Sequence, residues 1–208
     1  MKKIFLLLSL LCICMAGYSK GDGETAKVRS KYVNIGFSGT KFEQDDISTS
    51  ADYGAFLTIG RTFYLHKTPI LNLIKIGIDA SWLDLNYANF SKPFEIEKGT
   101  FHNAEAAMHI GPSVTVTPLN NLNVCAYLRY APTFTALYST VNDNYNLGYA
   151  TRFVCGASLS YKVIGVGVEA RFGKNKYEPF EAFLNDIDDA EKVNTKMAGC
   201  RVYLTFRF

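Results

Sequence analysis

The stretch Lys196–Phe208, which reads KMAGCRVYLTFRF, decides the fold. Its even-numbered positions from Ala198 to Phe208 are all apolar, whereas the odd-numbered positions between them include Arg201 and Arg207. Because successive side chains of a β-strand point to opposite faces, this stretch predicts a strand with one apolar and one polar face. Such a strand suits a transmembrane β-barrel, in which one face meets lipid and the other lines a polar lumen.

The same alternation recurs along the rest of the chain. It predicts strands at 31–40, 53–65, 70–83, 102–116, 122–134, 147–161, 164–172 and 196–208. The connections are short at 66–69, 117–121 and 162–163, and long and polar at 41–52, 84–101, 135–146 and 173–195. Short turns at one end and long loops at the other are typical of an all-β, eight-stranded, antiparallel up-and-down transmembrane barrel.

The short turns allow the register to be checked. Tyr161 would pair with Ile164, Leu65 with Ile70, and Val116 with Leu122, and in each case both partners lie on the apolar face. Pro112 interrupts the strand at 102–116, since proline cannot donate a backbone hydrogen bond, and we expect a β-bulge there.

The amino terminus has the layout of a secretory signal peptide over residues 1–19. Lys2 and Lys3 precede an apolar run that is too short to span a bilayer, and cleavage is expected after Ala16 or Ser19. The remaining 20–208 would form the barrel domain. Removing two of the 22 basic residues leaves 20 against 19 acidic ones, so the charge gives no reason to expect a nucleic-acid partner.

Aromatic residues distinguish two arrangements of this sheet. A soluble, lipocalin-like ligand carrier would place the apolar face inside the barrel. A membrane barrel would place it outside, with aromatic girdles at the two membrane surfaces. The sequence favours the second arrangement, with Trp82, Tyr130 and Tyr149 expected toward the loops and Phe63 and Tyr161 toward the turns.

Taken together, the signal peptide, the alternating strands, the long and short connections and the terminal Val202–Phe208 resemble the small outer-membrane β-barrels of the OmpA/OmpX type. The resemblance implies a monomer in the outer membrane of a Gram-negative bacterium, surrounded by lipid and lipopolysaccharide. It also implies that Leu204, Phe206 and Phe208 carry the signal read by the barrel-assembly machinery.

The polar face supplies the candidate functional residues. They are Lys75, Asp79, Glu105, His109, Arg129, Arg152, Glu169, Arg171 and Arg201. An eight-stranded barrel is just wide enough for side chains to fill, and charges buried in it must be paired, so we expect a structural network that plugs the lumen. The alternative is a narrow gated pore, which its arginines would make anion-preferring.

A catalytic role has one candidate, a barrel enzyme that modifies lipid A with His102 as base beside Glu105. The lipid A deacylase barrels carry a His-x-Ser-Asn pattern, and here Asn103 and Ala104 follow His102 instead. The sequence therefore favours a non-enzyme and shows no metal or cofactor pattern. The long acidic loops remain as a surface for an unidentified ligand, and the role expected is structural or surface interaction.

Overall fold

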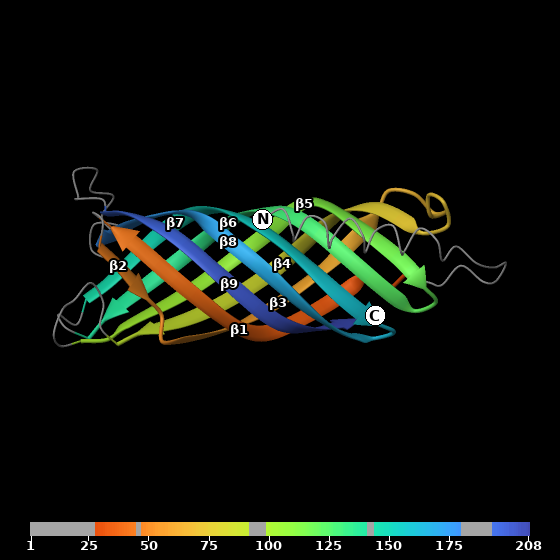
Figure 1. The fold of residues 1–208 in the computed structure, drawn as a ribbon. Coiled ribbons are helices and arrows are strands. Elements are labelled where there is room, and N and C mark those ends of the chain that lie inside the picture. Colours follow the sequence, from red (N-terminus) through yellow and green to blue (C-terminus); the bar gives the residue numbers. More distant parts are fainter. Residues whose placement is uncertain (1–27, 45–46, 92–98, 141–143, 180–192) are drawn as a thin grey trace, which may run out of the picture.

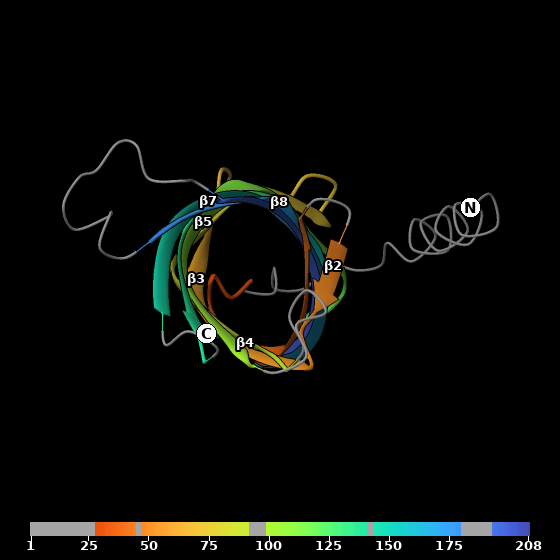
Figure 2. The same cartoon turned by 90° about the vertical axis from the view of Figure 1, so that its left-hand side faces the viewer.

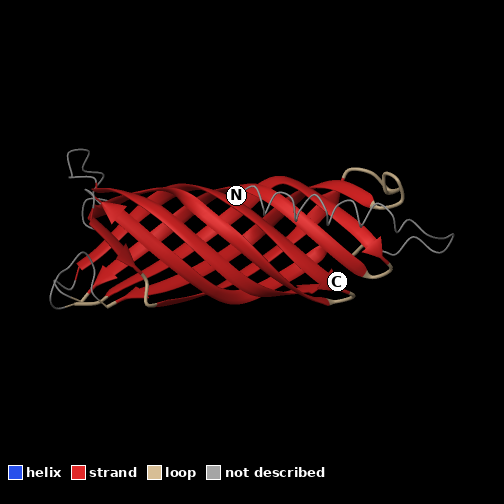
Figure 3. Ribbon diagram, in the orientation of Figure 1, coloured by secondary structure: helices blue, strands red, loops and turns tan. Residues whose placement is uncertain are grey.

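The computed structural model describes residues 28–44, 47–91, 99–140, 144–179 and 193–208, which form a closed antiparallel β-barrel (Figure 1). The strands are β1 (Lys31–Gln44), β2 (Ile47–Ser50), β3 (Tyr53–Tyr64), β4 (Ile74–Phe90), β5 (Phe101–Leu119), β6 (Leu122–Ser139), β7 (Asn144–Tyr161), β8 (Ile164–Pro179) and β9 (Val193–Arg207). Strands and their connections account for the whole of this part (Figure 3). It holds no helix of the length and apolarity needed to cross a membrane. The predicted signal peptide, 1–19, lies outside the described residues.

The barrel closes because β9 pairs back onto β1 (Figure 2). β2 pairs only with the end of β1, so it forms a hairpin beside the barrel wall. The hydrogen-bonded partners can be followed once around from Lys31. They run through Arg61, Ala80, Ile110, Tyr130, Phe153, Phe172 and Ala198 and return to β1 at Lys41, ten residues further along. A stagger of this kind tilts the strands by about 35–45° to the barrel axis.

One of the predicted hairpin pairings is confirmed. Tyr161 pairs with Ile164 around the turn Lys162–Val163. Lys162 has a φ of 54°, the left-handed conformation that tight two-residue hairpin turns require.

The other two predicted pairings are wrong. Leu65 donates its N–H to the carbonyl of Ile76, while Ile70 bridges Ile74 inside the turn. Val116 pairs with Val124, and a register shift then brings Leu119 opposite Leu122. Within the strands, before the shift at Leu119, both real registers differ from the predicted ones by an even number of residues, so the apolar face stays continuous all the same.

The β-bulge lies in β4 and not at Pro112. Pro112 pairs with Ile78 without a shift, whereas the β4–β5 register slips between Ser81 and Asp84. The extra residue changes which positions face inward: Asp79 and Ser81 are buried before the bulge, and Asp84 and Asn86 after it. An inserted residue has this effect because side-chain direction alternates with every residue.

All four predicted long loops are partly strand. β4 continues to Phe90, β6 to Ser139 and β8 to Pro179, and the segment 41–52 contains the end of β1 and all of β2. A tilted strand needs about 9–11 residues to cross a bilayer. With 15–19 residues in each of β4 to β9, the sheet extends beyond the membrane at the loop end. The acidic segment at 180–192 lies outside the described residues.

The sheet faces are as predicted. Phe37 is 78% exposed and Val202 61%, whereas Arg152 is 0% exposed and Arg201 1%. The outward apolar side chains form what we call the apolar belt, which includes Ile35, Phe37, Ile78, Ile110, Leu128, Phe153, Val168, Val202 and Leu204. The lipocalin-like alternative required the apolar face inside, and it is contradicted by this burial pattern.

Three tyrosines in the lumen lie across glycines. Tyr203 is paired with Gly167 on the adjacent strand, and a Cβ placed on Gly167 would lie 2.3 Å from the Tyr203 ring. The same relation joins Tyr127 to Gly156 and Tyr32 to Gly60. A side chain at these positions would displace the ring, so each glycine makes room for a large polar aromatic inside a narrow barrel.

Candidate functional site: the charged lumen

The structure brings together all but one of the predicted lumen residues. Asp79, Glu105, His109, Arg129, Arg152, Glu169, Arg171 and Arg201 are all buried inside the barrel. Lys75 is only partly buried, and its ammonium lies 5.3 Å from the centre of the Tyr64 ring near the turn end. The buried residues form three groups stacked along the barrel axis.

The group nearest the loops is centred on Glu105. Arg152 donates to both carboxylate oxygens, at 2.6 and 2.7 Å, and Arg171 Nη2 donates to one of them at 2.6 Å. Asn103 and Asn86 add amide hydrogen bonds to the same carboxylate. One carboxylate thus binds two arginines that project from β7 and β8, and bidentate contacts of this kind are the strong form of the ion pair.

The middle group joins opposite walls of the barrel. Arg201 on β9 donates to both oxygens of Asp84 on β4, at 2.8 and 3.0 Å, and also to Glu169 on β8 at 3.0 Å. Thr58 donates to Asp84 at 2.6 Å. His109 Nε2 lies 3.8 Å from Asp84 Oδ1, too far for a hydrogen bond.

The group nearest the turns is centred on Asp79. Tyr32 and Thr62 donate to its two oxygens at 2.6 and 2.8 Å. Arg129 Nε lies 2.8 Å from Asp79 Oδ1 but off the line of its N–H, so the contact is an ion pair rather than a hydrogen bond. The Arg129 guanidinium also lies 3.6 Å from the centre of the Tyr127 ring, within range of a cation–π interaction.

Tyr127 connects the group nearest the turns with the middle group. Tyr127 donates to Glu169 at 2.8 Å, and its hydroxyl lies 2.9 Å from that of Tyr203. The network is therefore continuous from Asp79 through Arg129, Tyr127 and Glu169 to Arg201 and Asp84.

Arginine exceeds carboxylate in the described lumen. Five buried arginines (Arg129, Arg152, Arg171, Arg201 and Arg207) face four buried carboxylates (Asp79, Asp84, Glu105 and Glu169). Nε and Nη1 of Arg171 and of Arg207 have no hydrogen-bond partner within the part of the chain that the structure describes. The lumen therefore carries a small positive excess.

Sequence reasoning missed several members of this network. Asp84 was assigned to a loop because the apolar alternation breaks at the bulge before it. Tyr32 and Thr58 carry no charge and gave no signal beyond their place on the polar face, and Asn175 lies in the segment predicted as a long loop. Tyr32 could have been found by noting that it shares that face with Asn34.

The residues predicted for the aromatic girdles are all on the outer surface. Phe63 and Tyr161 lie at the turn ends of β3 and β7, and both are exposed. Trp82 and Tyr130 lie at the middle of β4 and β6 rather than near their loop ends, and Tyr149 lies closer to the loop end of β7. Phe208 continues the end of β9, where its N–H and carbonyl exchange hydrogen bonds with Lys31, and Leu204 faces lipid in the same strand.

The pair proposed for catalysis is separated by the sheet. Glu105 points into the lumen, where the two arginines occupy it. His102 lies on the outer face, where Tyr87 Oη is 2.6 Å from its Nδ1 and the Tyr138 ring stacks on it. His102 and Glu105 thus do not act on one substrate atom. In the described residues no three His, Cys, Asp or Glu side chains gather as a metal site.

Comparison with known proteins finds similarity in overall architecture. Ail, the attachment invasion locus protein of Yersinia pestis, is 12% identical, with 87% of this chain and 100% of that chain covered and a TM-score of 0.48. Neisserial surface protein A is 9% identical, with 86% and 97% covered and a TM-score of 0.47. OprG from Pseudomonas aeruginosa is 8% identical, with 90% and 99% covered and a TM-score of 0.41. No protein-family model matches this sequence, and neither does any curated protein sequence.

Values this low assign no activity, ligand or residue role to the chain. The burial pattern of the structure itself carries the conclusion: an apolar outer face and a charged inner one around a closed ring of strands. Only such a closed barrel satisfies every backbone group of a β-sheet inside lipid. The chain is a closed, eight-stranded antiparallel β-barrel of the transmembrane type.

Proposed function

We propose that this protein is a non-conducting outer-membrane barrel with a structural or surface-interaction role. Its strands continue past the membrane at the loop end, and we call this part of the sheet the rim. The observation that carries the proposal is the network across the lumen, in which Arg201 joins β9 to Asp84 on β4. A side chain that spans the lumen at this level would obstruct the passage of ions.

The energetics favour a network that stays closed. Removing one partner of a buried ion pair typically costs about 3–5 kcal/mol, because the other charge is left buried and uncompensated. Opening a path past Asp84 and Glu105 would break several such contacts together. Thermal opening would therefore be rare.

The length of the strands supports a role at the rim. β4 to β9 extend beyond the part needed to cross the bilayer, and β2 adds a hairpin at the same end. Residues on such a rim are presented on a rigid scaffold, which is the usual arrangement for binding surfaces.

An anion-preferring pore is the second candidate, favoured by the excess of buried arginine. Planar-bilayer recording separates the two functions. We expect the wild-type barrel to give no discrete current steps and Glu105→Ala to give more frequent openings, because Arg152 and Arg171 lose their shared partner. Anion-selective steps in the wild type that change with Arg201→Ala would support the pore and contradict the proposal.

A further inference from the structure

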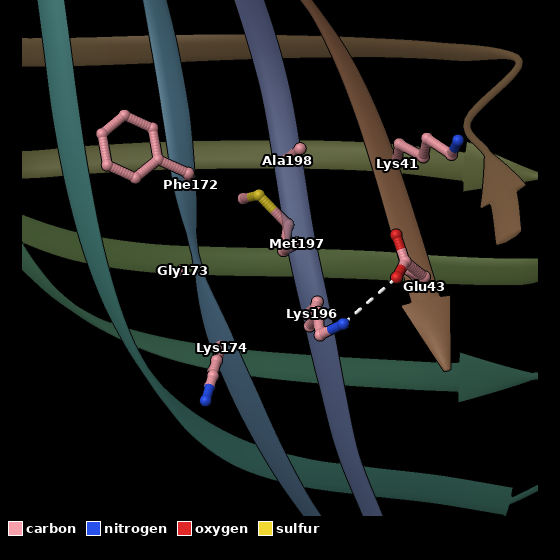
Figure 4. Close-up of a pocket in the computed structure, with 8 residues that line it drawn as sticks. All are labelled: Lys41, Glu43, Phe172, Gly173, Lys174, Lys196, Met197 and Ala198. Carbon is pink, nitrogen blue, oxygen red and sulfur yellow. Dashed lines mark hydrogen bonds and ion pairs between the residues drawn. The ribbon is translucent and has the colours of Figure 1, made fainter. Parts of the chain in front are cut away.

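A group of lysines lies on the outer surface of β8, β9 and β1, immediately above the apolar belt (Figure 4). Two cross-strand rows define it. The row nearer the turns is Phe172, Ala198 and Lys41, and the row one step nearer the loops is Lys174, Lys196 and Glu43. We call these six residues the lysine face.

The lysine face is poorly balanced in charge. Lys174 and Lys196 are direct cross-strand partners, an arrangement of like charges that destabilises a sheet. Glu43 forms an ion pair with Lys196 at 3.2 Å. Lys41 and Lys174 are exposed and have no ion pair with any residue that the structure describes. An anion bound among the three lysines would offset the repulsion between Lys174 and Lys196.

The surface is also hollowed here. A depression of about 360 Å³ lies between the two rows, with Phe172 and Ala198 on one side and Lys174, Lys196 and Glu43 on the other. In Figure 4 the Lys174 and Lys196 side chains lie on neighbouring strands at its edge. The depression is thus apolar toward the membrane and cationic toward the loops.

Its level along the barrel indicates what would fill it. On β8 the outward positions change from Phe172 to Lys174, and on β9 from Ala198 to Lys196, so the change from apolar to charged falls at the lysine face. Headgroup phosphates of a bilayer lie at this boundary, and lysine side chains are favoured there because they extend toward the charged layer.

The opposite side of the barrel has a different boundary. There the rings of Tyr53, Tyr87, His102, Tyr138 and Tyr145 contact one another in sequence across β3 to β7, with centroids 4.6–6.3 Å apart. An aromatic girdle suits any lipid headgroup region. Among the residues that the structure describes, the loop-end lysines are therefore concentrated on one sector of the barrel.

We propose that the lysine face binds a phosphate group of a phosphorylated glycolipid of the lipid A class, with an acyl chain against Phe172. In the outer membrane of the proposed function, with the loop end facing outward, lipid A would be the phosphate-bearing lipid of the surrounding leaflet. Lys41, Lys174 and Lys196 would donate charge-assisted hydrogen bonds to the phosphate oxygens. This inference rests on the membrane-spanning orientation of the proposed function but not on its closed lumen.

The test compares lipids retained by the full-length folded barrel. The protein is placed in phosphatidylcholine nanodiscs containing bis-phosphorylated lipid A, the same lipid A with its phosphates removed, or phosphatidylglycerol, and bound lipid is counted by native mass spectrometry. We expect phosphorylated lipid A to be retained about tenfold more strongly than the dephosphorylated form, a difference of about 1.4 kcal/mol.

Two triple variants provide a matched comparison. Lys41→Gln with Lys174→Gln and Lys196→Gln should abolish the preference. Lys31→Gln with Lys67→Gln and Lys162→Gln removes the same charge at the turn end and should retain it. Heat-modifiability on gels confirms that each variant is folded.

A gain-of-binding variant keeps the test independent of folding losses. Glu43→Gln frees Lys196 from its ion pair and should strengthen retention of phosphorylated lipid A. Equal effects of the two triple variants would overturn the proposal, as would equal retention of phosphatidylglycerol or displacement by millimolar inorganic phosphate alone. Bilayer conductance is unaffected in either case, so failure here is distinguishable from failure of the closed-lumen proposal.

Discussion

Arg201 on β9 and Asp84 on β4 form a two-hydrogen-bond contact across the barrel, at 2.8 and 3.0 Å. The two residues are 117 positions apart in sequence, and β1 and β3 separate their strands in the sheet. Their contact therefore depends on closure of the barrel. The two buried charges are therefore paired only when the barrel closes correctly.

Removing Asp84 alone should be more damaging than removing the pair. Asp84→Ala leaves Arg201 buried with one carboxylate partner, Glu169, and should lower the free energy of unfolding by about 3–5 kcal/mol. The double variant Asp84→Leu with Arg201→Met should cost less. Urea unfolding in lipid vesicles, followed by the fluorescence of Trp82, measures both, because Trp82 is the only tryptophan of the chain. Equal losses in the single and double variants would show that the pair is not coupled.

The tyrosine–glycine contacts predict a position-specific effect of alanine. Gly167→Ala places a Cβ against the Tyr203 ring and should destabilise the barrel by about 1–3 kcal/mol, as overpacking does. Gly39→Ala is the control, since the nearest atom to its added Cβ is 3.5 Å away. In a Tyr203→Ala background the Gly167→Ala change should cost less, because the ring that its Cβ would displace is absent. A control variant that is equally destabilised would contradict the explanation.

The rim contains a pH-sensitive contact between Asp52 and Ser91. Ser91 Oγ and the Ser91 N–H both donate to Asp52 Oδ2, and these hydrogen bonds lower the pKa of Asp52. A carboxyl group with a lowered folded-state pKa stabilises the fold above its unfolded pKa of about 4, and this contribution is lost as the pH falls through the lower value. The protection factor of the Ser91 amide hydrogen should therefore fall on acidification, and it should fall more than in Asp52→Asn. Identical pH profiles in the two proteins would refute this.

The terminal Phe208 predicts a difference between cells and purified components. If its ring carries an assembly signal, Phe208→Ser should lower the amount of folded barrel in the outer membrane. The same change should leave refolding into detergent unaltered, because the backbone hydrogen bonds with Lys31 remain. Parallel losses in both assays would assign Phe208 to stability instead.

The sequence was sufficient for the barrel and its two faces because lipid imposes strict alternation within the membrane. It could not give the strand ends, since the hydrogen-bonded sheet continues past Phe172 and Leu85 into water, where alternation is no longer required. It could not place Asp84 either, because the bulge beside Trp82 reverses the direction of every following side chain. The predicted pairings at Ile70 and Leu122 were wrong because the alternation of apolar residues excludes only shifts by an odd number of residues. Shifts by an even number keep the apolar side chains on the same face.

The sequence predicts which residues of the candidate site face the lumen. It does not predict which of them form ion pairs with one another. Arg152 and Glu105 could be placed inside from alternation alone. Their contact depends on the barrel stagger of ten residues, which the turns at Leu65–Ile74 and Thr117–Leu122 determine together with the bulge. None of these could be read from local sequence.

The most direct test of the account is quenching of Trp82 fluorescence by brominated lipids in vesicles. Trp82 lies outside the barrel at the middle of β4 and is 47% exposed. We predict strong quenching, greatest for bromine deep in the acyl chains. Absence of quenching at every bromine depth would contradict the account, because the apolar belt would then not face lipid.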